Sequence, residues 1–147
     1  MKKDVTSEPS VVNDILDRAD VLWLAFQDEE GLCSIPMNFA REDGILYVHS
    51  GRDGRKFRAL DTRATIAFSC AVDVKPKTSR DACGFGYYFK SVMGTAIPYL
   101  LPKEETVDAL DIITRKYAGE TLPYNVRVVP KTAVFALHIA KATARVK

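Results

Sequence analysis

Cysteine is scarce in this sequence, and the spacing of the three cysteines excludes the usual cysteine-based sites. Cys33, Cys70 and Cys83 form no CxxC pair, and no histidine stands near them at metal-ligand spacing. Neither a structural zinc site nor a disulfide framework is indicated. An odd number of free thiols suits a reducing compartment, so we expect a cytoplasmic protein without a bound metal.

Long apolar runs and strong charge are also missing. No run approaches the ~20 apolar residues that a membrane-spanning helix requires, and the N-terminus MKKDVTSEPS lacks the apolar core of a signal peptide. The net charge of +2 is too small and too evenly spread to favour nucleic acid as a partner. We therefore expect no membrane and no nucleic-acid partner.

Two catalytic signatures are absent as well. There is no GxGxxG fingerprint for a bound dinucleotide. No Ser/His/Asp arrangement or paired-carboxylate spacing supports hydrolysis. The residues alone therefore assign no catalytic side chain.

What the sequence does contain is a series of β-prone segments. The length of 147 residues, with 47% hydrophobic and 27% charged residues, suits one globular domain spanning 1–147, with a polar and loose N-terminus at 1–9. Helical patterns follow Ser10, Lys56 and Pro102, and the last of them stops at Gly119. We expect a mainly β fold with helices (α+β) and about six antiparallel strands, at 21–26, 32–39, 45–50, 65–71, 87–99 and 132–140.

The stretch 31–60 is the most informative. A polar turn at 41–44 predicts a hairpin between its two β-prone segments, and 32–39 is also expected to pair with 21–26. Pro36 cannot donate to a ladder, so its strand should lie at an edge or a bulge. Arg55 and Lys56 follow a loop with two glycines and precede a helix, which indicates an anion site and a phosphate-bearing ligand. The simpler interpretation of the two cations is a solvated helix start.

Later segments carry two further expectations. Residues 73–86 combine proline, glycine and charge without a period, which predicts a long loop in a site or a subunit contact. Gly94 stands inside a β-prone run and predicts a bulge or a close approach of another chain segment.

Five segments in one order carry a resemblance to a known family: IPMNF, GILYVHS, GRKF, YxFKSVMGTA and EETVDALDIITRKYAG. Together they resemble the nitroimidazole-resistance (nitroreductase) branch of the pyridoxamine 5′-phosphate oxidase-like superfamily, from about Ile15 to the last strand. The resemblance implies an FMN-binding split β-barrel. It also implies a homodimer whose interface holds two flavins, each contacted by both chains.

The resemblance places a cofactor site on the residues that match these motifs. A strand along the flavin ring and ribityl chain matches 34–39, with Pro36, Met37 and Asn38 beside the isoalloxazine. The basic pair Arg55 and Lys56 matches a phosphate clamp, in agreement with the anion site inferred from the residues. The implied cofactor-binding residues are Ser34, Pro36, Met37, Asn38, Phe39, His49, Ser50, Arg55, Lys56, Ser91 and Val92.

The implied function is that of a flavoprotein. It would be an oxidoreductase that uses FMN to reduce a small organic acceptor, nitroaromatic or quinone-like, with NADH or NADPH as a transient donor. Its ending, ATARVK, has no strong counterpart of pyridoxamine-phosphate recognition residues, so vitamin oxidation is not expected. Two alternatives stay open: a non-catalytic sensor or carrier of FMN, heme or a deazaflavin, where heme would use His49 or His138, and an empty dimeric scaffold.

Overall fold

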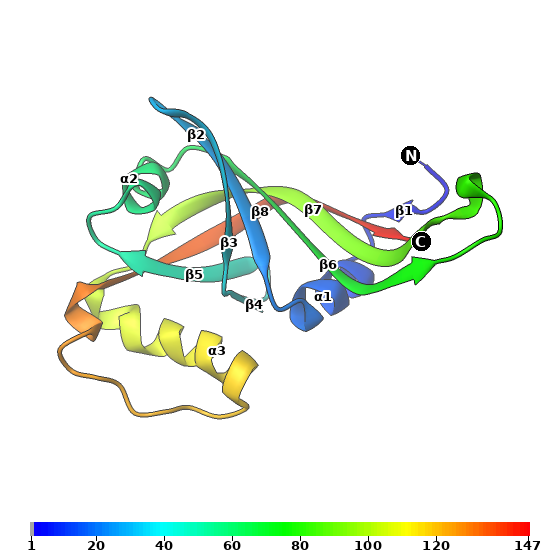
Figure 1. Cartoon of the computed structure of the whole chain (residues 1–147). Coiled ribbons are helices and arrows are strands. Elements are labelled where there is room, and N and C mark those ends of the chain that lie inside the picture. The colour runs from blue at the N-terminus through cyan, green and yellow to red at the C-terminus, as the bar shows by residue number, and fades with distance from the viewer. Residues whose placement is uncertain (1) are drawn as a thin grey trace.

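The computed structural model describes residues 2–147, and one antiparallel sheet dominates it (Figure 1). The sheet has eight strands in the order β3-β2-β6-β7-β8-β5-β4, with β1 paired to β8. The strands are β1 (Val5–Thr6), β2 (Leu22–Asp28), β3 (Gly31–Met37), β4 (Ala40–Glu42), β5 (Ile45–Gly51), β6 (Ile66–Lys77), β7 (Gly86–Leu100) and β8 (Thr132–Val146). The helices are α1 (Pro9–Arg18), α2 (Arg55–Asp61) and α3 (Thr106–Ala118), with short 3₁₀ segments η1 (Ala82–Gly84), η2 (Lys103–Glu105) and η3 (Val129–Lys131).

The sheet curls without closing. Its two edge strands, β3 and β4, follow one another along the chain and are not hydrogen-bonded to each other. Helix α2 contacts β2, β5 and β7, while α3 contacts β4, β5 and β8 (Figure 1). This open sheet with helices confirms the expected α+β split barrel, with eight strands in place of about six.

The core lies inside the curl because the strands alternate between an inner and an outer face. Leu24 and Phe68 are cross-strand neighbours on the inner face, and both are buried. Leu46 and Leu137 form a second inner pair. Each such fully buried side chain contributes about 1.5–3 kcal/mol by leaving water, so the alternation fixes the register of the whole sheet.

The ends of the helices follow local chemistry. Pro9 is the first residue of α1, where its missing N–H costs no helical hydrogen bond. Gly119 ends α3 in the left-handed conformation, with φ of 79°, which confirms the stop predicted there. Within residues 2–147, no helix combines the length and apolar character needed to cross a bilayer.

The expectation of a loose N-terminus is wrong for residues 2–9. Val5 and Thr6 pair with Arg145 and Ala144 of β8. The Arg145 guanidinium also binds the Asp4 carboxylate at 2.7 Å. A two-residue strand has no periodicity of its own, so only its distant partner reveals it. Met1 lies outside the described residues.

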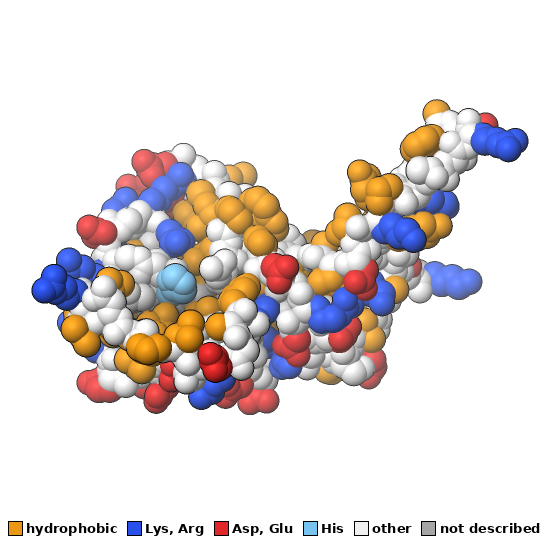
Figure 2. Space-filling view, turned by 60° about the horizontal axis from the view of Figure 1, so that its bottom comes forward, with side chains coloured by type: hydrophobic (Ala, Val, Ile, Leu, Met, Phe, Trp, Pro, Cys, Tyr) orange, Lys and Arg blue, Asp and Glu red, His pale blue; other side chains and the backbone are white. Residues whose placement is uncertain are grey.

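The loop expected at 73–86 is shorter than predicted, because 73–77 belong to β6 and Gly86 to β7, while 78–85 lie between the two strands. The register between β6 and β7 shifts at a bulge between Val72 and Lys75, where Asp73 has a φ of 53°, and regular strand pairing continues after the bulge. The outer part of the resulting β6–β7 arm, residues 73–90, projects from the body, and apolar side chains are exposed along the arm (Figures 1 and 2).

The hairpin predicted across residues 31–60 is only partly correct. The turn at Asp43 and Gly44 joins β5 to the short strand β4, not to 32–39. Strand β3 pairs with β2 instead, as also expected, with Pro36 opposite Trp23. The buried Phe39 separates β3 from β4, and β3 is an edge strand, as Pro36 predicted.

Gly94 confirms the predicted close approach and yields a test. A Cβ at this position would meet the Lys141 carbonyl oxygen and lie 2.7 Å from Cζ of the buried Phe68. Because neither group can move freely, Gly94→Ala should lower the free energy of unfolding by about 1–3 kcal/mol. Gly86→Ala on the same strand has open space and serves as the control in chemical denaturation. Equal stability of the two variants would contradict the close packing.

Candidate functional site

An open groove lies between the edge strand β3 and helix α2. Its volume is about 390 Å³. We call it the β3–α2 groove; its lining residues are Phe26, Cys33, Ile35, Pro36, Arg55 and Lys56. The groove therefore combines a mostly apolar wall with two cations.

Strand β3 presents two different kinds of surface to a ligand. The side chains of Ser34, Pro36 and Asn38 are exposed, whereas those of Met37 and Phe39 are buried. An edge strand also carries unpaired backbone N–H and C=O groups along its free side. The side chains of Met37 and Phe39 are therefore not available to a ligand, and the backbone N–H and C=O of Phe39 already bind the Tyr117 hydroxyl.

The two predicted residues of β5 lie on opposite faces of that strand. His49 is exposed and Ser50 is buried, with the Ser50 hydroxyl donating to the Gly51 carbonyl at 2.7 Å. Partial desolvation and, after it, repulsion by the Lys56 charge lower the pKa of His49 below its ordinary value. The positive charge of Lys56 therefore acts on the His49 imidazole.

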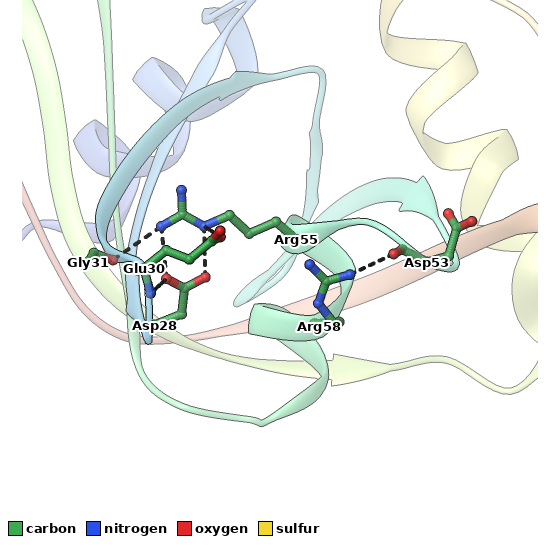
Figure 3. Close-up of polar contacts among 6 residues, drawn as sticks. All are labelled: Asp28, Glu30, Gly31, Asp53, Arg55 and Arg58. Atoms are coloured by element: carbon green, nitrogen blue, oxygen red, sulfur yellow. Dashed lines mark hydrogen bonds and ion pairs between the residues drawn. The ribbon is translucent and has the colours of Figure 1, made fainter.

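The two predicted phosphate ligands, adjacent in sequence, differ in their partners. Arg55 binds both Asp28 and Glu30 (Figure 3). Lys56, by contrast, has no carboxylate within ion-pair distance among residues 2–147. The groove thus holds one neutralised guanidinium and one ammonium that is free to bind an anion.

Ser91 and Val92 are not part of the groove in a single chain. Val92 lies in the core, and Ser91 lines a larger cavity of about 660 Å³ together with Trp23 and Ser69. This cavity opens on the outer face of the sheet, where the register places Trp23 beside Ser69 and Ser69 beside Met93. The structure therefore divides the predicted residues between two places.

Several residues that shape the site were not anticipated. The acidic turn containing Asp28 and Glu30 lies more than twenty positions from Arg55, and no local pattern links the two segments. Tyr117 is a second case, because its hydroxyl accepts from the Phe39 N–H at 3.0 Å and donates to the Asp20 carbonyl at 2.8 Å. It fixes the junction between β3 and β4 from the last turn of α3.

Lys116 supports the same junction. Its ammonium lies 3.5 Å from the centre of the Phe39 ring and donates to the Leu16 carbonyl. Burial lowers the pKa of Lys116 to about 8, because a half-buried ammonium loses hydration. The end of β3 is thus held by α3 and α1 before any ligand binds.

Comparison with known proteins fits this arrangement. The family model described as pyridoxamine 5′-phosphate oxidase matches residues 8–146, nearly the whole chain. The chain belongs to the pyridoxamine 5′-phosphate oxidase family. Membership covers the β3–α2 groove, the outer sheet face and the β6–β7 arm alike. No curated protein matches the chain.

Solved structures place this family member among proteins of the same fold. A candidate 5-nitroimidazole antibiotic resistance protein from Bacteroides thetaiotaomicron VPI-5482 is 26% identical, with a TM-score of 0.83 over 97% of this chain and 86% of that chain. The flavocytochrome Anf3 from Azotobacter vinelandii is 22% identical, with a TM-score of 0.86 over 100% and 72% of the two chains. A FAD and heme binding protein from Mycobacterium smegmatis is 16% identical, with a TM-score of 0.88 over 99% and 74%.

Proposed function

We propose that this chain binds FMN in the β3–α2 groove, with the flavin ring along the free edge of β3 and the phosphate on Lys56. One observation carries the proposal: an apolar groove lies between an unpaired strand edge and a lysine free of carboxylate partners among residues 2–147. A flavin ring needs a flat apolar surface and a few backbone hydrogen bonds. A phosphomonoester needs a cation.

The energetics of these contacts are adequate for a bound cofactor. A charge-assisted hydrogen bond from Lys56 to phosphate is worth about 1.5–3 kcal/mol. A micromolar ligand requires about 8 kcal/mol in total. Apolar contact with the ring at about 25 cal/mol per Å² of buried area supplies a comparable contribution. Hydrogen bonds between free backbone groups of β3 and the polar atoms of the flavin ring add specificity.

The number of free cations favours FMN over a dinucleotide flavin. FMN carries one terminal phosphate, and Lys56 is the groove cation without a carboxylate partner among residues 2–147. A second phosphate would face the carboxylates of Asp28 and Glu30, which lie at the same end of α2. One relative is a FAD and heme binding protein by name and another is a flavocytochrome. These names support a flavin on this fold, and the choice of FMN over FAD rests on the single free cation of the groove.

The reaction that we propose is reduction of a small organic acceptor, nitroaromatic or quinone-like, with a nicotinamide donor. When bound, the flavin supplies the redox chemistry. The residues of this chain bind the phosphate, orient the ring and shield one side of it with the apolar wall of the groove. The name of the Bacteroides relative supports a nitroaromatic acceptor, and no side chain in the groove selects one acceptor over another.

A second copy of the chain is the proposed partner. The outer sheet face exposes Trp23 and Met93, at 48% and 67% of their surface, in a row with Ser69 and Pro36. Exposed apolar surface of this kind marks an interaction site. Because Pro36 also lines the groove, a copy on this face would cover the flavin and bring its own Ser91 near the site.

Heme is the alternative ligand, because one relative of the same fold is a FAD and heme binding protein by name and another is named a flavocytochrome. His49 is exposed beside the groove cation, and the His138 ring packs edge to face against Tyr99 at 4.7 Å. A heme protein would need one of these imidazoles as the iron ligand.

The identity of the cofactor and the reaction are tested together. We expect the purified protein to show two flavin absorption bands, to release FMN on denaturation, and to oxidise NADH or NADPH when a nitroaromatic or quinone is added. A Soret band that is lost in His49→Ala would instead establish heme. Flavin bands without turnover for any acceptor would leave a carrier and contradict the enzyme.

The phosphate contact is tested by Lys56→Met. Loss of one charge-assisted hydrogen bond should weaken FMN binding by about 10- to 100-fold and leave riboflavin, which has no phosphate, unchanged. Arg58→Gln removes the same charge from an exposed position on α2 and is the control. Calorimetric titration of both flavins into the wild type and the two variants measures all six affinities. An unchanged preference for FMN over riboflavin in Lys56→Met would rule out this phosphate site.

The dimer is tested by Trp23→Glu. A charge at the centre of an apolar interface should dissociate the dimer, since truncation of a central Trp alone typically costs about 2 kcal/mol or more. Sedimentation velocity should show monomers, with weaker FMN binding. Val126→Glu, at a residue 83% exposed in the connection between α3 and β8, is the control. A wild-type monomer that binds FMN tightly would contradict the shared site.

A further inference from the structure

We infer that Arg55 is a positioning residue and not a phosphate ligand: its guanidinium holds the tip of the β2–β3 hairpin against α2 and thereby sets the width of the β3–α2 groove. The inference rests on the proposed binding of FMN in this groove. It separates the roles of two neighbouring cations that the sequence treats alike.

The geometry of Arg55 is that of a completed ion pair (Figure 3). Its Nε donates to Oδ2 of Asp28 at 2.8 Å, and its Nη2 donates to Oδ1 at 2.8 Å. The same Nε lies 3.0 Å from a Glu30 carboxylate oxygen, and Nη2 reaches the Gly31 carbonyl at 3.3 Å. Two parallel hydrogen bonds between a guanidinium and a carboxylate form the strongest and most directional geometry of such pairs.

The carboxylate side of this pair is also fixed in place. Oδ1 of Asp28 accepts the backbone N–H of Glu30 at 2.9 Å, which shapes the turn between β2 and β3. The Arg55 hydrogen bonds lower the pKa of Asp28, and Asp28 raises the pKa of Arg55. Both groups therefore stay ionised at neutral pH, and the pair persists wherever FMN binding would be measured.

Recruitment of Arg55 to a phosphate would be unfavourable. The guanidinium would leave Asp28 and Glu30 without their partner, and both carboxylates would then repel the doubly charged phosphate. Lys56 makes no such pair among residues 2–147 and can bind the phosphate without breaking one. The arrangement assigns the anion to Lys56.

The position of Arg55 in the chain explains how it acts on the groove. It is the first residue of α2, whereas Gly31, which it contacts, is the first residue of β3. Cys33 and Ile35, which follow on β3, form the wall that faces α2. Breaking the pair would let the hairpin tip move away from α2 and widen the groove along its length.

The two roles predict opposite signs for one substitution, Asp28→Asn. If Arg55 positions the hairpin, Asp28→Asn and Arg55→Gln should each weaken FMN binding by about tenfold, and the double variant should be no weaker than either. Riboflavin affinity should fall in both single variants, because the groove itself is altered. In Arg55→Gln the loss should be larger for FMN, since the unpaired carboxylates of Asp28 and Glu30 then repel its phosphate. If Arg55 were a phosphate ligand, Asp28→Asn would free its guanidinium and strengthen FMN binding.

Titration of both flavins into wild-type protein, the two single variants and the double variant decides the matter, with Arg58→Gln as the charge control. Tighter FMN binding by Asp28→Asn, or a loss confined to FMN in Arg55→Gln, overturns the inference while leaving the proposed function intact. A wild-type protein that binds neither flavin overturns the proposed function itself, and the inference with it.

A measurement on the wild-type protein keeps the test independent of how the variants fold. The Nε–H resonance of Arg55 in a ¹H–¹⁵N spectrum should respond alike to FMN and riboflavin, since the guanidinium stays on Asp28. A large shift caused by FMN and absent with riboflavin would show direct phosphate contact and overturn the inference.

Discussion

The free edge of β3 is the constraint on which the rest of this structure depends. Pro36 has no N–H to donate, and the buried Phe39 carries the chain from β3 into β4 without letting these two strands pair. The curled sheet therefore stays open along this line. Helix α2 packs against β2, β5 and β7 and leaves a groove with apolar side chains of β2 and β3 on one side and the cations of α2 on the other. The groove therefore exists only because the barrel does not close.

The formal charges of the groove residues overstate the positive charge that is available to a ligand. Arg55 and Lys56 are adjacent and carry the same charge, yet carboxylates already neutralise the first of them. An anion therefore meets one effective cation, at a defined place, beside an apolar wall. A ligand with one phosphate and a flat ring satisfies all three features together, which is why FMN is the proposal that these residues support best.

Local signals account for much of the fold. Pro36 predicted an edge strand, Gly94 a close approach and Gly119 a helix end. Each prediction follows from a property of the residue itself, because proline has no N–H to donate and glycine has no side chain. The errors share a different cause. The strand at Val5–Thr6 exists only through β8, and the Arg55 pair with Asp28 joins segments that no periodicity relates. The motif resemblance proposed a set of site residues, and the tertiary structure shows that Ser91 and Val92 of that set lie away from the groove and that Arg55 already has carboxylate partners.

The account is tested most directly by a crystal structure of the chain with FMN. It predicts the flavin along the free edge of β3, the phosphate within hydrogen-bond distance of the Lys56 amine, and Arg55 still bidentate on Asp28. A phosphate held by Arg55, or a flavin bound away from the groove while Lys56 faces solvent, would contradict it.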